Sequence, residues 1–464
     1  MTFALSAIII PLAGSFMTVL APKRLKPLLA SVILGLTFLF TLPVIAQVVS
    51  GRQLAISWNL SSWFNLSFIA DGLSAFMAAV SSFVAFLVSL YSLEYMEHYE
   101  DRDAFFFWVV LFVGSMMGLV FSGNLMLMFC FWEMTSVCSW RLIGFYRRDK
   151  DAKAADKAFL VTFFGASLML IGIVLIYLET GTLELSTLKG YTVSKTVAFL
   201  ILAGILSKSA QLPLQTWLPD AGVAPTPVTA LLHAAVLVKI GIYVFARLFG
   251  ITFLAPDAFF NATIALSLLT ILVAAGSAMV ENNMKRILAY STISQLGYIL
   301  FALALNERLA FQVALIYILA HSLAKAGLFL CAGIIEQKCG TKDITELGGL
   351  IKTMPFTATA YLLCAFSIIG IPPFLGFWPK FMVVLMAVQK GYILAGSLGI
   401  AGAVLTLFYL MRLFNSVFLG EIKIEKEEER NSPMTWVVII LGFLSLALGV
   451  AFALPFNLVS RLSQ

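Results

Sequence analysis

Uninterrupted apolar runs of about 20 residues recur along the whole chain, and they limit the possible folds more than any other feature. Only 12% of the 464 residues are charged, whereas soluble domains carry about 25%. Inside lipid, backbone polar groups must be satisfied by the protein itself, which only helices and closed barrels achieve. Because the runs are continuous rather than alternating, the sequence predicts an all-α polytopic membrane protein.

We expect about fourteen transmembrane helices. The predicted spans are residues 3–22, 28–49, 67–93, 105–122, 124–144, 158–178, 194–212, 226–249, 258–280, 287–305, 309–335, 355–373, 379–412 and 433–456. The thirteenth of these is too long for one helix. We interpret residues 379–390 as the second half of a twelfth helix that is broken at Pro372–Pro373, with helix 13 starting near Tyr392.

The loops predict an orientation, because most of the lysines and arginines outside the spans follow odd-numbered helices. The positive-inside rule then places those loops in the cytoplasm and both termini on the outer side of the inner (cytoplasmic) membrane. Residues 50–66 are expected to form a short hairpin on the outer face, with Trp58 and Trp63 at the interface. Residues 180–192 are predicted to be a short interfacial helix, and residues 421–431 a solvated cytoplasmic loop.

Two predicted spans contain similar proline-rich interruptions. Pro213 to Pro219 reads P-L-Q-T-W-L-P, and Pro373 to Pro379 reads P-F-L-G-F-W-P. Paired broken helices are typical of inverted repeats with a site near the bilayer midplane. We therefore divide the chain into residues 1–104 (helices 1–3 and the hairpin), 105–249 (first five-helix repeat), 258–418 (second, inverted repeat) and 419–464 (cytoplasmic loop and helix 14).

Few titratable residues fall within the predicted spans, and each is costly in lipid. Away from the helix ends they are Glu133 on helix 5, Lys208 on helix 7, His233 and Lys239 on helix 8, His321 and Lys325 on helix 11, and Lys380 on helix 12. Such residues normally mark an ion or substrate path. The stretch from Lys208 to Lys239, with Pro213, Pro219, Pro225 and Pro227, is therefore interpreted as a channel-lining element.

Glu133 is the only carboxylate deep in a predicted span, and Lys208 is its natural partner. The pair could be purely structural, but buried ion pairs stabilise poorly against apolar replacements, so we favour a role in loading and releasing the lysine proton. His321 and Lys325 lie four residues apart on one helical face, and His233 and Lys239 lie six apart. We favour a proton relay over satisfied core histidines, although Lys380 could instead snorkel from a helix end.

No other chemistry is indicated by the sequence. It contains no glycine-rich phosphate loop, no histidine and cysteine cluster with metal spacing, and no basic pattern typical of nucleic-acid binding. We expect no cofactor, no metal and no redox centre in this chain.

Four motifs, quoted in order, resemble one family. They are K-S-A-Q-L-P-L-Q-T-W-L-P-D-A with A-P-T-P-V-T-A-L-L-H-A-A-V-L-V-K (208–239), M-K-R-I-L-A-Y-S-T-I-S-Q-L-G (284–297), H-S-L-A-K-A-G-L-F-L-C-A-G (321–333) and G-I-P-P-F-L-G-F-W-P-K (370–380). The chain resembles the antiporter-like subunits of respiratory complex I, of Mrp-type cation/proton antiporters and of membrane-bound, energy-converting hydrogenases.

The resemblance implies fourteen helices, inverted five-helix repeats with helices 7 and 12 broken, and an axis of buried charges. Glu133 and Lys208 match the family's helix-5 and helix-7 pair, Lys239 its bridging lysine, His321 and Lys325 its helix-11 pair, and Lys380 its terminal site.

Two departures from the family pattern stand out. Asn283 replaces a usual aspartate, for which we expect a local change in helix capping. The chain ends soon after helix 14, which resembles the medium-length type without a lateral helix, and F-W-P-K favours the hydrogenase group.

The sequence thus predicts a proton-translocating subunit of a larger redox-driven or Mrp-type complex, with sodium as a second cargo left open. Its expected partners are other membrane subunits, further antiporter-like subunits included. If the complex is an NADH dehydrogenase-like or hydrogenase oxidoreductase, its redox centre lies in another subunit. The alternative is a stand-alone secondary transporter of a small solute, for which the spans offer few polar side chains.

Overall fold

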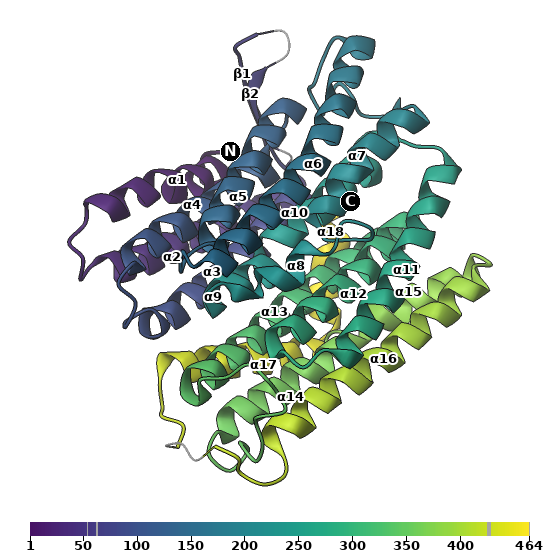
Figure 1. The fold of residues 1–464 in the computed structure, drawn as a ribbon. Coiled ribbons are helices and arrows are strands. Elements are labelled where there is room, and N and C mark those ends of the chain that lie inside the picture. The colour runs from purple at the N-terminus through teal and green to yellow at the C-terminus, as the bar shows by residue number, and fades with distance from the viewer. Residues whose placement is uncertain (53, 62–63, 425–427, 464) are drawn as a thin grey trace.

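The computed structural model describes residues 1–464 except 53, 62–63, 425–427 and 464, and the chain folds into one bundle of helices (Figure 1). The α-helices are α1 (Thr2–Leu20), α2 (Lys26–Val49), α3 (Gly72–Tyr95), α4 (Arg102–Phe121), α5 (Leu125–Ile143), α6 (Asp149–Thr180), α7 (Lys195–Lys208), α8 (Trp217–Asp220), α9 (Thr226–Ala230), α10 (Leu237–Arg247), α11 (Asp257–Val280), α12 (Met284–Ala304), α13 (Arg308–Cys339), α14 (Pro355–Ile369), α15 (Phe377–Gln389), α16 (Ile393–Phe418), α17 (Pro433–Val450) and α18 (Ala453–Leu462). Three shorter helical segments are η1 (Ala221–Val223), η2 (Leu231–Ala235) and η3 (Leu248–Thr252). The strands are β1 (Leu54–Asn59), β2 (Asn65–Ala70), β3 (Tyr191–Thr192) and β4 (Phe253–Leu254).

The helices account for each of the fourteen predicted spans. Within the described residues, eleven helical segments are long and apolar enough to cross a membrane. The remaining three spans correspond to α5, to the short α7 that precedes a break, and to the pair α14 and α15. This architecture confirms the prediction of an all-α polytopic membrane protein.

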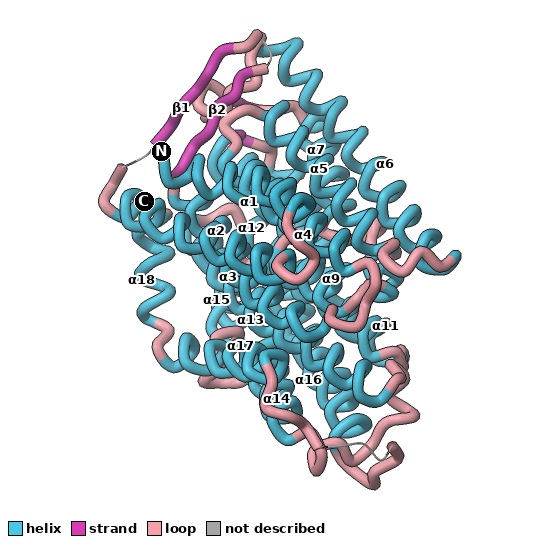
Figure 2. The backbone as a smooth tube through the Cα atoms, turned by 90° about the vertical axis from the view of Figure 1, so that its left-hand side faces the viewer, coloured by secondary structure: helices cyan, strands magenta, loops and turns pink. Residues whose placement is uncertain are grey.

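A β-hairpin marks one end of the bundle. Strands β1 and β2 pair antiparallel, with Leu54 opposite Ala70, and project beyond the helices (Figure 1). The backbone carbonyl of Leu462 packs against Gly72 just after this hairpin, so both termini lie near it (Figure 2). We call this the hairpin end, and the other end, with the loop of residues 341–354, the opposite end.

The hairpin predicted for residues 50–66 is therefore present but extends to Ala70, and helix 3 begins at Gly72 rather than at residue 67. Trp58 is exposed, whereas Trp63 lies outside the described residues.

Two predictions about helices are wrong. Residues 181–190 form turns rather than an interfacial helix, because Gly181 and Gly190 adopt the left-handed conformation and end regular structure on both sides. Helix 14 ends at Val450 instead of residue 456, and a separate helix, α18, follows after a two-residue turn. Helix α18 returns the chain to the hairpin end, where Gln312 donates a hydrogen bond to Ser463 (2.8 Å).

Helices 7 and 12 are both broken, as predicted. The chain leaves helical geometry between α7 and α8 at residues 209–216, and between α14 and α15 at residues 370–376. Gly370 ends α14 with a φ of +88°, a conformation that side-chain-bearing residues rarely adopt. Each break exposes carbonyl groups that the helix itself can no longer satisfy.

Two sets of backbone contacts, far apart in the sequence, have the same pattern. At the hairpin end, Leu125 N–H donates to Leu183 O and Leu185 N–H to Gly123 O. At the opposite end, Met284 N–H donates to Lys342 O and Ile344 N–H to Asn282 O. In both places an asparagine, Asn124 or Asn283, is the N-cap of the helix that follows.

The most enclosed part of the bundle is formed by the α9–α10 segment, α12 and α13, whereas α1, α2, α6 and α16 keep much of their surface exposed. Large side chains such as Trp132, Trp217 and Tyr243 are fully buried around this centre. Four of the titratable side chains of the spans, His233, Lys239, His321 and Lys325, belong to these enclosed segments.

Candidate functional site

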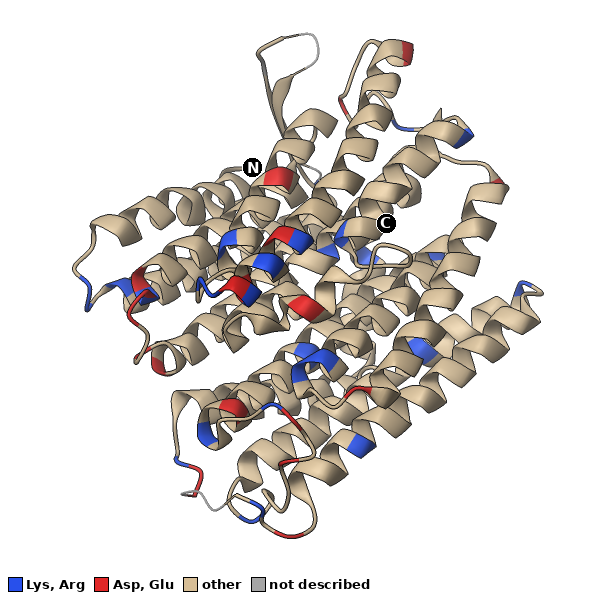
Figure 3. Ribbon diagram, viewed as in Figure 1, with Lys and Arg blue, Asp and Glu red and all other residues tan. Residues whose placement is uncertain are grey.

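Six of the seven predicted site residues are buried at the centre of the bundle. Lys208, His233, Lys239, His321 and Lys325 expose none of their surface, and Lys380 exposes 5%. Figure 3 shows basic positions inside the bundle as well as in its loops. Glu133 differs from the others, because its side chain is half-buried, on the face of α5 that carries the exposed Val137.

Lys208 is the last residue of α7, and it reaches across to α5. Its Nζ donates to Ser136 Oγ (2.6 Å) and to Trp132 O (3.2 Å), and lies 5.2 Å from the centre of the Trp132 ring. The face of an indole ring attracts a cation, so Trp132 contributes through both its backbone and its ring.

The predicted ion pair between Glu133 and Lys208 is not formed. Among the described residues Glu133 has no cation within ion-pair distance, and its buried Oε1 has no hydrogen-bond partner. Trp132 and Ser136, one residue before and three residues after Glu133, accept the hydrogen bonds of Lys208 instead. Glu133 lies in the same turn of α5 as these two residues, so any effect of its charge on Lys208 is exerted through space.

Lys239 and His321 meet at the centre. Lys239 Nζ lies 3.2 Å from His321 Nδ1 and also donates to Ala234 O. When Lys239 is charged its ammonium group has donors only, so Nδ1 then accepts from it and the ring hydrogen lies on Nε2. This contact joins α10 to α13.

The π-helical turn η2 sets the geometry around Lys239. The carbonyl of Leu231 accepts from Val236 N–H, and Val236 has non-helical dihedral angles (φ −121°, ψ −77°). The α-helical spacing expected for His233 and Lys239 does not apply across this turn. Because of it, the lysine ammonium can reach back to Ala234 O.

His233 lies in the π-helical turn and packs on Phe329, with 4.4 Å between ring centres. Within the described part of the chain neither of its nitrogens has a hydrogen-bond partner, and His321 Nε2 also has none. Buried imidazole nitrogens normally hydrogen-bond to protein or to water, so these three atoms retain unused capacity for hydrogen bonds.

Lys325 shares the α13 face of His321 but does not contact that histidine by a hydrogen bond. Its Nζ donates to Leu288 O on α12 (3.2 Å). Lys325 therefore ties α13 to α12, while His321 ties α13 to α10.

Lys380 lies in the first turn of α15, directly after the break in helix 12. Its Nζ donates to Ile368 O (2.6 Å) and Ile369 O (3.1 Å), which are carbonyls left without helical partners at the end of α14. It also lies 5.1 Å from the centre of the Tyr298 ring. These contacts hold the ammonium inside the protein, so Lys380 does not snorkel to the helix end.

Neutral polar groups of α12, α13 and α16 lie in this half of the bundle. Tyr317 donates to Gln295 Oε1 (2.8 Å), Gln295 Nε2 donates to Thr406 (3.4 Å), and Ser291 is hydrogen-bonded to Tyr409 (2.7 Å). The sequence pattern alone did not reveal this cluster. The feature that could have indicated it is the spacing of Ser291 and Gln295, which lie four residues apart on one face of α12.

A buried ion pair toward the opposite end was also not predicted. Lys285 Nζ lies 2.6 Å from Glu336 Oε2, and Lys342 Nζ lies 3.0 Å from Glu336 Oε1. Thr226 donates to the same carboxylate (3.2 Å). Lys285 and Glu336 fall just outside the most apolar windows, so the predicted spans leave them out.

A second unpredicted ion pair lies toward the hairpin end. Asp71 caps α3 and forms a bidentate pair with the buried Arg247 of α10, which also donates to Tyr243 (3.1 Å). Burial disfavours the charged carboxylate, but Arg247 and the hydrogen bonds from Ser74 outweigh it and lower the pKa of Asp71 to about 2. Tyr243 is four residues from Lys239, on the same helical face.

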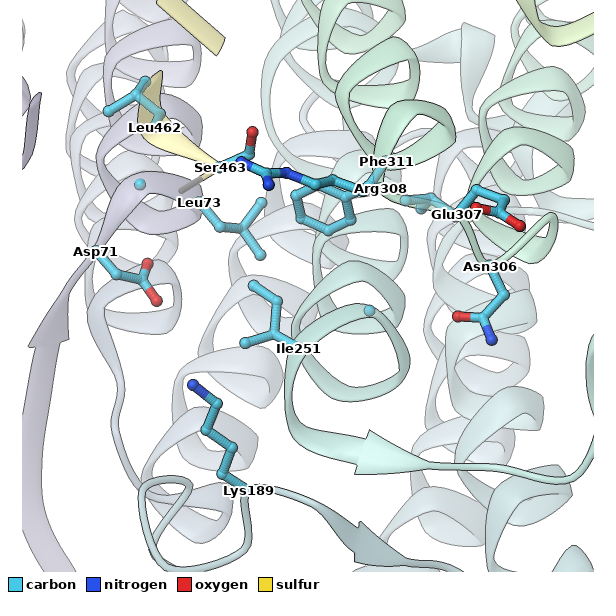
Figure 4. Close-up of a pocket in the computed structure, with 13 residues that line it drawn as sticks. Asp71, Leu73, Lys189, Ile251, Asn306, Glu307, Arg308, Phe311, Leu462 and Ser463 are labelled. Carbon is cyan, nitrogen blue, oxygen red and sulfur yellow. The ribbon is translucent and has the colours of Figure 1, made fainter. Parts of the chain in front are cut away.

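A cavity of about 340 Å³ opens beside Asp71. Lys189, Asn306, Glu307, Arg308 and Ser463 are among its lining residues (Figure 4). The cavity brings polar side chains from the hairpin end next to the Asp71–Arg247 pair. None of the seven predicted site residues lines it.

Taken from α5 to α15, the buried groups form a series of proton donors and acceptors. Each amine is held by carbonyl or hydroxyl oxygens or by an imidazole rather than by a carboxylate. Among the described residues, no cluster of three or more histidines, cysteines or carboxylates could hold a metal ion. The arrangement suits proton transfer between neutral and charged amines.

Comparison with known proteins gives consistent matches. Residues 122–406 match the family described as "NADH:quinone oxidoreductase/Mrp antiporter, TM", and residues 59–107 match "NADH-Ubiquinone oxidoreductase (complex I), chain 5 N-terminus". The first match covers the breaks and all seven predicted site residues.

Two curated relatives align with nearly the whole chain. It is 33% identical over 466 residues to the A/B subunit of a probable K(+)/H(+) antiporter of Rhizobium meliloti, which covers 97% of this chain and 46% of that protein. It is 33% identical over 471 residues to the L subunit of the NADH-quinone oxidoreductase of Escherichia coli, covering 97% and 76%. The chain thus spans about half the length of the first relative.

A solved structure shares the fold. A chain of the membrane-bound sulfane sulfur reductase, an archaeal respiratory membrane complex, superposes with a TM-score of 0.90 at 25% identity, covering 99% of this chain and 96% of that chain.

Proposed function

Because this chain belongs to the NADH:quinone oxidoreductase/Mrp antiporter family of membrane proteins, we propose that it translocates protons as one subunit of a larger membrane complex. The complex would couple redox chemistry in another subunit, or an opposing ion gradient, to proton movement. Relatives named as antiporter and oxidoreductase subunits support both forms of coupling.

The single observation that carries this proposal is the contact between Lys239 Nζ and His321 Nδ1 at 3.2 Å. Both residues are completely buried, and they come from different halves of the chain. A titratable amine and a titratable imidazole at hydrogen-bond distance can exchange a proton directly.

In the proposed path a proton enters near Lys208 and reaches Lys239, close to His233 of the adjoining π-helical turn. It then passes His321 and Lys325 and leaves near Lys380. The charge of Glu133 tunes the first step, because a negative charge close to Lys208 favours its protonated form. Moving one charge against 100 mV costs about 2.3 kcal/mol, which sets the scale of the driving force needed.

We propose protons as the cargo and see less support for sodium. Sodium prefers several oxygen ligands, and those near Glu133 would have to come from Thr135 and Ser136. Thr135 donates to Trp132 O, and Ser136 Oγ accepts from Lys208. A sodium site there would require Lys208 to move away.

The same proposal includes two inverted repeats, residues 105–249 and 258–418, in the inner (cytoplasmic) membrane with both termini outside. The matched contacts around Leu125 and Met284 occur at opposite ends of the bundle, as inversion requires. The position of both termini near the hairpin agrees with an even number of spans.

Partners in the complex are proposed to include further antiporter-like subunits. Val137 and Trp140 of α5 are exposed. Glu133 lies on this side of α5, so a neighbouring subunit there could shift its charge relative to Lys208.

The proposal is tested with sealed vesicles that contain the native complex, by measuring proton translocation and turnover in parallel. Lys239→Met is expected to reduce protons moved per turnover at least about tenfold, since the bridge to His321 is lost. Lys195→Met, at the exposed start of α7, is the matched control and should behave like the wild type. Unchanged pumping per turnover in Lys239→Met would overturn the proposal.

The alternative of a stand-alone solute transporter gains no support. The cavity beside Asp71 lies at the hairpin end, and none of its lining residues belongs to the buried series.

A further inference from the structure

A second cavity, of about 510 Å³, lies at the opposite end between α6, α8 and the start of α12. Five of its lining residues are cationic and one is acidic. They are Lys150, Lys153, Lys157, Arg286, Lys342 and Asp220. We call these six residues the basic cavity.

The positive charge of the basic cavity is only partly compensated. Asp220 lies 2.6 Å from both Lys157 and Arg286 and is therefore shared. Arg286 also pairs with Glu281 (2.8 Å), and Lys342 with Glu336 (3.0 Å). Among the described residues, Lys150 and Lys153 form no ion pair and are exposed.

The cations of α6 continue directly into an apolar stripe on the same helix. Lys153, Lys157, Leu160 and Phe164 follow one another at spacings of four, three and four residues, so they share one face. The apolar members are exposed, Leu160 by 63% and Phe164 by 56%. Ile171 (50%) and Leu178 (73%) extend the stripe toward the hairpin end.

This combination matches the two parts of one kind of molecule. Basic pockets at the cytoplasmic ends of membrane helices bind phosphate headgroups, and the exposed stripe offers a surface for acyl chains. We propose that the basic cavity and the adjoining stripe of α6 bind an anionic phospholipid, with its phosphate among Lys150, Lys153 and Lys157.

The cations of the basic cavity and the apolar stripe follow one another on α6, and this favours a lipid over other anions. A small soluble phosphate would use the cations but leave the stripe uncovered. An acidic protein segment would use the cavity, but the stripe would require it to enter the bilayer. Only a molecule with a charged head and apolar tails matches both surfaces of α6 at once.

The bound lipid would also connect separate parts of the fold. Its phosphate would lie beside Asp220, which follows the break in helix 7, and beside Arg286, at the start of α12. Those two residues already form a salt bridge (2.6 Å). None of the seven residues of the proposed proton path takes part, so the inference does not depend on that path.

The test is lipid binding to the purified native complex, measured by native mass spectrometry. The probes are dioleoyl phosphatidylglycerol, dioleoyl phosphatidylcholine and inorganic phosphate. The variant is Lys150→Gln/Lys153→Gln, which removes two exposed charges without breaking an ion pair. The control is Lys23→Gln/Lys352→Gln, which removes two exposed charges elsewhere.

We expect phosphatidylglycerol to bind the wild type and the control equally, and the variant roughly tenfold more weakly, which corresponds to about 1.4 kcal/mol. Phosphatidylcholine should bind all three weakly, and millimolar inorganic phosphate should not displace phosphatidylglycerol.

Three results would overturn the inference. The first is equal binding of phosphatidylglycerol to variant and control. The second is displacement by inorganic phosphate, which would identify a site for small anions. The third is an absence of phosphatidylglycerol binding together with loss of a protein component from the variant complex, which would identify a protein as the occupant.

Discussion

Residues 105–249 and residues 258–418, the two halves of the proposed repeat, share two backbone features but differ in their chemistry. Each half begins a helix with an asparagine cap, Asn124 or Asn283, and holds it with the same pair of backbone hydrogen bonds. Each half then contains one broken helix. The ionisable side chains do not follow this correspondence.

The difference is clearest at the two breaks. In helix 7 the carbonyl of Ser207 accepts from the indole of Trp217 (2.9 Å) and from the N–H of Ala210 (3.4 Å), and Lys208 contacts α5 instead. In helix 12 the free carbonyls of Ile368 and Ile369 accept from Lys380. A neutral side chain caps the first break, and a charged one caps the second.

This difference separates two roles that a buried lysine can have. Lys208 precedes its break and is not needed to satisfy it, so its proton and its position can change. Lys380 follows its break and completes the backbone there. The caps and the breaks recur in both segments, whereas the ionisable side chains beside them differ.

The largest effect is expected from removing each lysine in turn. Lys208→Met should reduce protons moved per turnover at least about tenfold and leave the unfolding midpoint almost unchanged, because Ser136 keeps a bond to Trp132 O (3.3 Å). Lys380→Met should also lower the midpoint, since two buried carbonyls lose their partner at about 1–3 kcal/mol each. Proton flux in vesicles and thermal unfolding in detergent measure the two effects. An equal loss of stability in both variants would show that Lys208 and Lys380 do not differ in their structural roles.

A second prediction concerns the helix that packs on the helix-12 break. A Cβ at Gly449 of α17 would lie 2.2 Å from Pro373 O and 2.3 Å from Leu375 N. Gly449→Val should therefore destabilise the protein by about 3 kcal/mol, at the upper end of overpacking costs. Gly276→Val is the control, because no atom lies within 4 Å of its Cβ position. Similar unfolding midpoints for the two variants would show that α17 does not brace this break.

The ion pair Asp71–Arg247 gives a reference for a buried cation with a structural role. Because the pKa of Asp71 is lowered from 3.8 to about 2, its stabilisation is present above pH 4 and is lost as the pH falls toward 2. Asp71→Asn should cost about 2 kcal/mol at pH 7 and make stability less sensitive to acid. Protons moved per turnover should stay at the wild-type value. A loss of pumping as large as that of Lys208→Met would place this pair on the path.

The smallest effect is expected at the matched helix caps. Asn124→Ala and Asn283→Ala should each cost about 1 kcal/mol, because each asparagine accepts two backbone N–H groups at its helix start. Unfolding midpoints compared side by side would test the correspondence of the halves. A clear difference between the two losses of stability would mean that the two helix caps have the same hydrogen bonds but contribute different amounts of stability.

Most of the fold could be predicted from the sequence, because lipid leaves few options for an apolar chain. Long apolar runs predicted the spans, and prolines near Pro213 and Pro373 predicted the two breaks. The turns at residues 181–190 and the break between α17 and α18 were missed, because local backbone geometry decided them rather than hydropathy.

The sequence predicted which residues form the candidate site but not which groups those residues contact. Burial of Lys208, Lys239 and His321 follows from their position in apolar runs. Their partners depend on how helices meet: the π-helical turn η2 redirects Lys239, and Ser136 replaces Glu133 beside Lys208. Lys285 and Glu336 were overlooked because hydropathy cannot show that another helix covers a residue near a span's end.

The contact at His321 has a consequence for the timing of transport. With Lys239 charged, Nδ1 of the ring is the acceptor and Nε2 carries the hydrogen. If a proton arrives at Nδ1 and another departs from Nε2, the ring is left as the opposite tautomer, with its hydrogen facing Lys239. Before the next proton can follow the same route, the imidazole must rotate or exchange its hydrogen. The tautomer of the ring therefore has to be restored after each proton it passes, and this restoration is a separate step in every transport cycle.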